Sequence, residues 1–107
     1  MKEKILVTSA LPYINNVPHL GHIVGCHLPA DIFYRYHKNL GDDVAFIGGA
    51  DSHGTATLIS AKEVDMEPTE FVLKLADVHK KIYDKLNISY SLFSRTNTEI
   101  HAKNTQE

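Results

Sequence analysis

The chain has 107 residues, of which 43% are hydrophobic and 22% charged, with a formal net charge of -2 and one cysteine, Cys26. These values are typical of one small globular domain or part of one, and they argue against wholesale disorder. The sequence has no strongly basic patch and no cysteine framework, which argues against a stand-alone nucleic-acid binder, a disulfide scaffold and a cysteine-rich zinc site.

No apolar run in the sequence is long enough to cross a bilayer, and the N-terminal residues MKEKILV lack the extended apolar region of a signal peptide. We therefore expect a cytoplasmic protein without membrane contact. The sequence carries no signal for the oligomeric state.

The first predicted elements are a short buried strand and a long helix. Residues 5–9 contain the β-branched apolar run ILV, which favours a strand. A helix is predicted over residues 19–40 from its apolar spacing, and Pro29 is expected to kink or split it. Gly41 is a typical residue for ending such a helix.

The remaining elements follow the order strand, helix, helix, strand, helix. They are a strand at 44–47 that ends in GGADSHGT, helices at 55–64 and from Pro68, a strand at 90–93, and a helix from Thr96, which has capping-box spacing to Glu99. The helix from Pro68 has a predicted apolar stripe of Phe71, Leu75, Val78, Ile82 and Leu86. This order predicts parallel βαβ units.

We therefore expect an α/β fold, a Rossmann-like parallel sheet with flanking helices. Two or three parallel strands leave sheet surface uncovered and an edge exposed, so the sheet is expected to be incomplete. Residues 1–107 would form the N-terminal part of a nucleotide-binding domain, with no second domain in this chain.

The loop after the first strand has the chemistry of a phosphate site. In open α/β sheets ligands lie beyond the carboxyl ends of the strands, and a helix start offers N–H groups to an anion. Pro18 suits the first helical position, with the N-cap at Asn16 or Val17. His19 and His22 lie three residues apart and share one face of the first turn, where each ring N–H can meet a phosphate oxygen.

Two other interpretations of the histidine pair remain at this point. An i, i+3 pair can ligate a metal, although a metal site needs further ligands and no partner motif is evident. The pair can also lie unused on a helix surface. Neither a P-loop nor a dinucleotide-binding fingerprint is present in the sequence.

Three segments of the sequence resemble one enzyme family. HLGH is similar to the HIGH signature of class I aminoacyl-tRNA synthetases, and TSALPYINNVPHLGH resembles its form in methionyl-tRNA synthetases. GGADSHGTATLISAKE and NISYSLFSRTN resemble later segments of the same family, in the same order. The resemblance covers nearly the whole chain and implies the first half of a class I synthetase catalytic domain.

The resemblance implies an ATP site in the first loop. The family joins methionine to ATP and then transfers the methionyl group to tRNA(Met). His19 and His22 would be the catalytic residues that contact the ATP phosphates, and Asn15 and Gly21 would bind the nucleotide, with Gly21 against the adenine. ATP would be the substrate, together with Mg²⁺.

The resemblance also implies a methionine pocket. Ala10, Leu11 and Tyr13 match its wall, and Asp51 matches the carboxylate that pairs with the ammonium group of the substrate. Leu11 and Tyr13 could instead be ordinary core residues, and Asp51 could be the N-cap of the helix near Thr55.

Several parts of the family are missing from the sequence. The lysine-rich KMSKS-type loop, the insertion with zinc-binding cysteines and the anticodon-binding helices are absent. Any zinc would be bound outside this span, and tRNA(Met) would bind through the missing domains. We expect this chain alone to be inactive in aminoacylation. The alternatives are a small HxGH nucleotidyltransferase and a non-catalytic, truncated copy that binds methionine or nucleotide.

Overall fold

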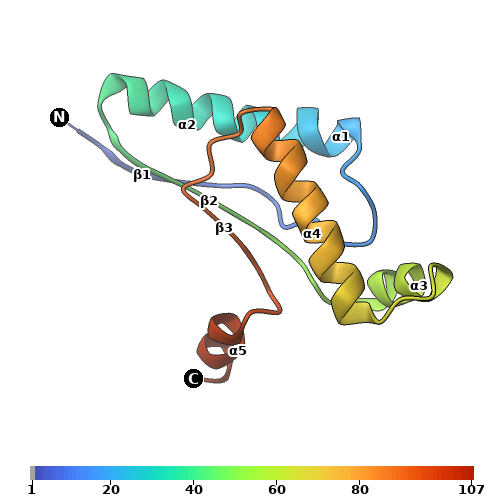
Figure 1. Cartoon of the computed structure of the whole chain (residues 1–107). Coiled ribbons are helices and arrows are strands. Elements are labelled where there is room, and N and C mark those ends of the chain that lie inside the picture. Colours follow the sequence, from blue (N-terminus) through green and yellow to red (C-terminus); the bar gives the residue numbers. More distant parts are fainter. Residues whose placement is uncertain (1) are drawn as a thin grey trace.

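The computed structural model of the chain describes residues 2–107. Its elements are shown in Figure 1 and comprise β1 (Lys4–Thr8), α1 (Leu20–His22), the π-helix η1 (Ile23–His27), α2 (Leu28–Leu40), β2 (Asp43–Ala50), α3 (Thr55–Glu63), α4 (Pro68–Lys85), β3 (Leu92–Arg95) and α5 (Glu99–Gln106). None of the described helices combines the length and the apolar character that crossing a bilayer requires.

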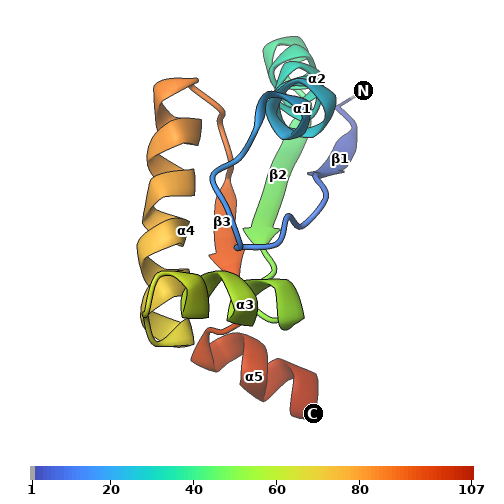
Figure 2. The same cartoon turned by 90° about the vertical axis from the view of Figure 1, so that its right-hand side faces the viewer.

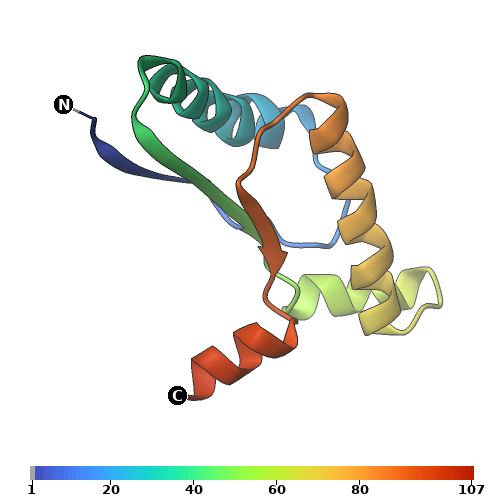
Figure 3. The same cartoon turned by 60° about the vertical axis from the view of Figure 1, so that its left-hand side comes forward.

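The three strands form one parallel sheet in the order β1-β2-β3, which confirms the predicted α/β fold. Helices α2 and α4 lie on the same side of this sheet, and α3 and α5 lie beyond the carboxyl ends of the strands (Figures 1 and 3). Side chains alternate between the two faces, so Val7 and Phe46 face the helices. On the other face Leu6 is 67% exposed and Leu92 is 56% exposed. Only one face of the sheet is covered by the described residues.

The core consists of two apolar clusters. The larger one contains Val7, Tyr34, Phe46, Tyr83 and Ile88 and joins the sheet to α2 and α4. The smaller one contains Ile14, Ala50, Val72 and Ala76. Because Ile14 belongs to the loop after β1 and is fully buried, part of that loop is core structure.

The second strand is longer than predicted at both ends, and the third lies two residues further along the chain. Strand β2 continues beyond residue 47, because Gly48 to Ala50 pair with β3. Strand β3 was predicted at 90–93 but begins at Leu92. Tyr90 precedes it, and the Tyr90 ring stacks on Phe46 with the ring centroids 4.2 Å apart.

The long helix after the first loop contains a π-helical segment, Ile23–His27, that the sequence did not predict, and the helical backbone continues through His27 and Leu28 into α2 rather than splitting at Pro29. Gly41 ends α2 in the left-handed conformation, with φ of 86°, which confirms its predicted role. The predicted N-cap at Asn16 or Val17 is wrong. His19 is the N-cap, because its own side chain accepts the first free N–H groups of the helix.

Two further helix details differ from the prediction. The fully buried row of α4 is Val72, Ala76, His79 and Tyr83, one residue along from the predicted stripe. This row contains a histidine and an alanine, which a search for large apolar residues passes over. Helix α5 is capped by Thr98 rather than by Thr96. The hydroxyl of Thr96 instead accepts a hydrogen bond from the backbone N–H of Ser52.

The close approach of Tyr90 to β2 yields a prediction for Gly48. A Cβ atom at Gly48 would lie 2.2 Å from the Tyr90 ring, whereas one at Gly25 would meet nothing within 4 Å. The Tyr90 ring cannot move freely, because its hydroxyl is hydrogen-bonded to Ser9 and His27. We expect Gly48→Ala to lower the free energy of unfolding by about 1–3 kcal/mol through overpacking.

The matched control is Gly25→Ala, which should raise the free energy of unfolding by about 0.5–1 kcal/mol through helix propensity. Urea unfolding of the two variants measures both changes. A destabilisation of equal size in both variants would contradict the packing assigned to Tyr90.

Candidate functional site

Two backbone hydrogen bonds join the loop after β1 to the end of β2. The N–H of Ile14 donates to the carbonyl of Asp51 over 3.0 Å, and the N–H of Asp51 donates to the carbonyl of Pro12 over 2.9 Å. They form a parallel β-bridge between Tyr13 and Asp51. The two loops that the sequence singled out are therefore one structural unit at the carboxyl edge of the sheet.

His19 and His22 stack on each other at the start of α1, with ring centroids 3.8 Å apart and an interplanar angle of 20°. Nδ1 of His19 accepts hydrogen bonds from the N–H groups of Gly21, at 3.0 Å, and His22, at 3.4 Å. Nδ1 of His22 accepts from the N–H of His19 at 3.4 Å. This reciprocal arrangement is a capping box built from two histidines.

The capping box has a chemical consequence for both rings. A ring nitrogen that accepts a hydrogen bond carries no proton, so the Nδ1 contacts favour the neutral tautomer with the proton on Nε2. Each histidine then keeps one Nε2–H group as a donor. The sequence predicted free backbone N–H groups at the helix start, but those of Gly21 and His22 are occupied by His19.

A cavity of about 400 Å³ adjoins the histidine pair. It is lined by Pro12, Tyr13, Asn15, Asn16, Val17, Pro18, His19, His22 and His79. The structure therefore brings together four of the predicted site residues, Tyr13, Asn15, His19 and His22. Within residues 2–107 no three histidine, cysteine, aspartate or glutamate side chains come together as a possible metal site.

The other predicted site residues lie apart from this cavity. Leu11 lines a separate cavity of about 330 Å³, together with Gly48, Gly49, Leu92 and Ile100 among others. Ala10 is exposed. Gly21 has a local reason to be glycine, because a Cβ atom there would lie 2.9 Å from the His19 ring.

Asp51 is half-buried beside Tyr13, and its Oδ1 accepts a hydrogen bond from the N–H of His53 at 3.2 Å. The N-cap of α3 is Gly54, which has no capping side chain. The interpretation of Asp51 as that N-cap is therefore wrong. Among the described residues no lysine, arginine or histidine forms an ion pair with this carboxylate.

Sequence reasoning missed a buried polar network behind the histidine pair. His27, at the end of η1, is 1% exposed. Its Nδ1 lies 2.6 Å from the Tyr90 hydroxyl, and its Nε2 lies 3.1 Å from the Tyr83 hydroxyl. The Tyr90 hydroxyl is also 2.9 Å from the hydroxyl of Ser9. The network thus ties the end of β1 to the π-helix that follows His22.

Burial keeps the network neutral. Removal from water, with smaller contributions from nearby His22 and His79, lowers the pKa of His27 from 6.5 to about 4. Removal from water also raises the pKa of both Tyr83 and Tyr90. His27 is therefore neutral near pH 7, and each tyrosine keeps its hydroxyl proton as a donor.

His79 on α4 is a second buried histidine that the sequence did not indicate, and it is 1% exposed. Its Nε2 lies 2.7 Å from the backbone carbonyl of Asn16, and its Nδ1 has no hydrogen-bond partner. Burial lowers its pKa, an effect that the contact with Asn16 opposes. Its helical spacing from Val72, Ala76 and Tyr83 was the signal that could have placed it inside.

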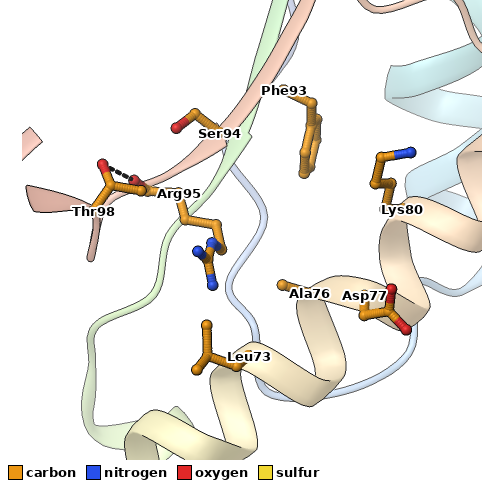
Figure 4. A pocket seen from close by; sticks show the side chains of 8 residues that line it. All are labelled: Leu73, Ala76, Asp77, Lys80, Phe93, Ser94, Arg95 and Thr98. Carbon is orange, nitrogen blue, oxygen red and sulfur yellow. Dashed lines mark hydrogen bonds between the residues drawn. The ribbon is translucent and has the colours of Figure 1, made fainter. Parts of the chain in front are cut away.

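A further cavity, of about 310 Å³, lies between α4 and β3 (Figure 4). Arg95 extends from β3 toward Leu73 of α4, and Asp77 and Lys80 line the opposite wall. Asp77 is paired with Lys81, and Lys80 is paired with Asp84. None of the residues predicted from the sequence to act in the site lines this cavity.

The parallel sheet with a loop and helix start at its carboxyl edge is the arrangement of an open α/β ligand-binding domain. The family model described as tRNA synthetases class I (M) matches residues 5–107, and the chain belongs to this family. The resemblance seen in the sequence is therefore confirmed.

The similar proteins are methionine–tRNA ligases. The enzyme of Chlamydia abortus is 44% identical over 107 residues, which are 100% of this chain and 19% of that protein. The cytoplasmic enzyme of Arabidopsis thaliana is 48% identical over 97 residues, which are 91% of this chain and 12% of that protein.

Among solved structures, Mycobacterium tuberculosis methionyl-tRNA synthetase in complex with methionyl-adenylate is similar, with a TM-score of 0.90 and 29% identity. The match covers 94% of this chain and 20% of that one. The chain thus spans a fifth or less of the length of these proteins.

The pKa of His27 predicts a loss of stability in acid. Because this pKa is lower in the folded chain than in the unfolded chain, the unfolded state binds the proton more tightly between pH 6.5 and about 4. The stabilisation is complete above pH 6.5 and is lost as the pH falls toward 4. From pH 7 to pH 5 we expect this one group to lower the free energy of unfolding by about 2 kcal/mol.

Urea unfolding at both pH values measures this loss, and His27→Gln is the control, because its amide keeps hydrogen-bonding groups but does not titrate. Carboxylates contribute equally to both proteins, so the difference between their pH slopes isolates His27. Equal slopes would contradict the assignment.

Proposed function

We propose that residues 1–107 form the N-terminal part of the nucleotide-binding catalytic domain of a methionine–tRNA ligase. The whole enzyme would activate methionine with ATP and transfer the methionyl group to tRNA(Met). The observation that carries the proposal is the pair of stacked histidines, whose Nδ1 atoms are engaged by backbone N–H groups and whose rings line a cavity with Tyr13 and Asn15.

The histidine cavity is proposed to hold the phosphates and ribose of ATP. Two Nε2–H donors on stacked rings can contact neighbouring phosphate oxygens and stabilise the charge that develops on the α-phosphate. Asn15 lines the same cavity and adds an amide that can both donate and accept. Gly21, in the turn between the histidines, would lie against the adenine. ATP would bring Mg²⁺ with it as part of the substrate.

Methionine is proposed to bind on the sheet side of the same loop. Leu11 lines an apolar cavity over the uncovered sheet face, and Ala10 precedes it. Tyr13, in the same loop, is joined to Asp51 by the backbone bridge. An apolar, polarisable wall suits a thioether. The carboxylate of Asp51 would pair with the ammonium group of methionine, which places the amino acid beside the nucleotide.

In the proposed reaction a carboxylate oxygen of methionine attacks the α-phosphorus of ATP. The bond from that phosphorus to the bridging oxygen of pyrophosphate breaks, and pyrophosphate leaves with the electron pair. His19 and His22 would act by hydrogen bonding and positioning, without taking a proton. The Mycobacterium tuberculosis relative, solved with methionyl-adenylate, supports this product.

The remaining parts of the function are proposed by similarity to longer relatives. tRNA(Met) would be bound by segments that this chain lacks, and any zinc would be held there too. The names of several relatives include the word cytoplasmic, which supports a cytoplasmic location. Inactivity of the chain alone in aminoacylation stays a prediction.

Thermal unfolding with a non-hydrolysable methionyl-adenylate analogue tests the proposal. At about one hundred times its Kd the analogue should add about 2.7 kcal/mol to the free energy of unfolding and raise Tm by on the order of 10 °C. The leucyl analogue should give a much smaller rise. No rise with the methionyl analogue would contradict a methionyl-adenylate site in this chain, and an equal rise with both would contradict methionine recognition.

Asp51→Asn separates the amino-acid half of the site from the nucleotide half. Loss of one charge-assisted contact should weaken binding of the methionyl analogue by about 10- to 100-fold and leave ATP binding unchanged. Asp43→Asn, an exposed position at the other end of β2, is the control. Equal effects of the two substitutions would remove Asp51 from the site.

A further inference from the structure

One contact between α4 and the first loop is not explained by packing alone. Figures 1 and 2 show α4 running beside the loop that joins β1 to α1. At this crossing Nε2 of His79 lies 2.7 Å from the backbone carbonyl of Asn16. A carbonyl oxygen only accepts, so the ring must donate, and the proton lies on Nε2.

The other ring nitrogen shows that this arrangement has an energetic cost. Nδ1 of His79 is buried and has no hydrogen-bond partner among the described residues. A buried acceptor without a donor costs about 1–3 kcal/mol. An apolar side chain of similar size would avoid that cost and would also fill the space. The contact to Asn16 is therefore the feature that distinguishes histidine from such a residue at this position.

The described part of the loop has few other hydrogen bonds to distant residues. Ile14 is held by the hydrogen bond to Asp51 and by burial against Val72 and Ala76 of α4. Beyond Ile14 the side chain of Asn16 accepts only a local hydrogen bond, from the N–H of Val17. The His79 contact is the next one to another element.

His19, where the capping box begins, follows Asn16 by three residues, so the position of Asn16 restricts where His19 can lie. Val72, Ala76 and His79 lie on one face of α4. This face holds the loop twice, by apolar contact at Ile14 and by a hydrogen bond at Asn16.

We propose that His79 is a positioning residue for the nucleotide site, which sets the placement of His19 and His22 through the hydrogen bond from its Nε2–H to the carbonyl of Asn16. The inference rests on the proposed function for its ligand. It assigns His79 no contact with the reacting atoms, although its ring lines the same cavity as the histidine pair.

Three substitutions separate the hydrogen bond from the packing. His79→Gln places an amide N–H near the position of Nε2, so it keeps the donor. In His79→Asn the side chain is too short to reach the carbonyl of Asn16. In His79→Phe an aromatic ring remains, but it has no hydrogen-bond donor. Ile88→Val is the control for stability, because Ile88 is buried in the larger core cluster. It should cost about 0.5–1.5 kcal/mol without touching the loop.

Calorimetric titration of the chain with ATP and with the methionyl-adenylate analogue, well below Tm, gives the first readout. We expect His79→Phe and His79→Asn to weaken binding of both ligands by about 3- to 10-fold, the worth of one hydrogen bond. His79→Gln should recover most of the affinity. Ile88→Val should lower Tm and leave affinity unchanged. If the parent binds the ligands and His79→Phe binds them with the same affinity, or if Ile88→Val weakens binding equally, the proposal is overturned.

Nitrogen NMR of the histidine rings gives a second readout that needs no ligand. The parent should show an exchange-protected Nε2–H on His79, and His19 and His22 as Nε2–H tautomers. His79→Phe should average the tautomers of His19 and His22, and His79→Gln should restore them.

The parent chain could show these NMR changes and yet bind neither ATP nor the analogue. That result would support the positioning role of His79 and count against the proposed function. A parent without a protected Nε2–H on His79, or unchanged tautomers in His79→Phe, would overturn the positioning role.

Discussion

The site depends on the two backbone hydrogen bonds between Asp51 and the segment from Pro12 to Ile14. They extend the parallel pairing of β1 and β2 past the ends of both strands, so the first loop cannot move independently of the second. Burial of Ile14 protects this bridge from water. The proposed nucleotide loop and the proposed amino-acid carboxylate, separated by many residues in the sequence, thereby become neighbours. The proposed joining of two substrates would require this placement before any side chain acts.

Four histidines near that bridge have structural roles, two as helix caps and two as buried residues. His19 and His22 replace the usual serine or aspartate cap with two imidazoles, and the capping contacts fix their tautomers. His27 and His79 are buried behind them, and their lowered pKa values reflect the cost of placing a charge there. The same residue type therefore serves as cap and as core, and in the proposed function also as a donor to the ligand. For the buried pair, His27 and His79, the lowered pKa makes the stability of the fold depend on pH, because protonation in acid would place a charge in the core.

The sequence predicted the elements with a repeating physical signal and missed those set by tertiary contact. The ILV run, the stop at Gly41 and the order of strands and helices led to the correct α/β fold. The placement of the histidine pair on one face at the start of a helix was predicted correctly, because a strand, a proline-bearing loop and an i, i+3 spacing form a local pattern. The N-cap was missed because histidine is not a usual capping residue, although the contact is local. The π-helix had no signal in the sequence, and the buried row of α4 was missed because it depends on contacts with distant elements. His79 illustrates this, because only its contact with Asn16, 63 residues away, shows what it does.

The most direct test of the central claim is an amide NMR titration of the chain with the non-hydrolysable methionyl-adenylate analogue. If the bridged loops form one site, signals of both loops should shift together with a single Kd. These include Leu11 to His22 in the first loop and Asp51 to Gly54 in the second, while the C-terminal end of α2, residues 36–40, remains unchanged. Shifts confined to one loop, or two loops that titrate with different Kd values, would contradict a single site for methionine and nucleotide.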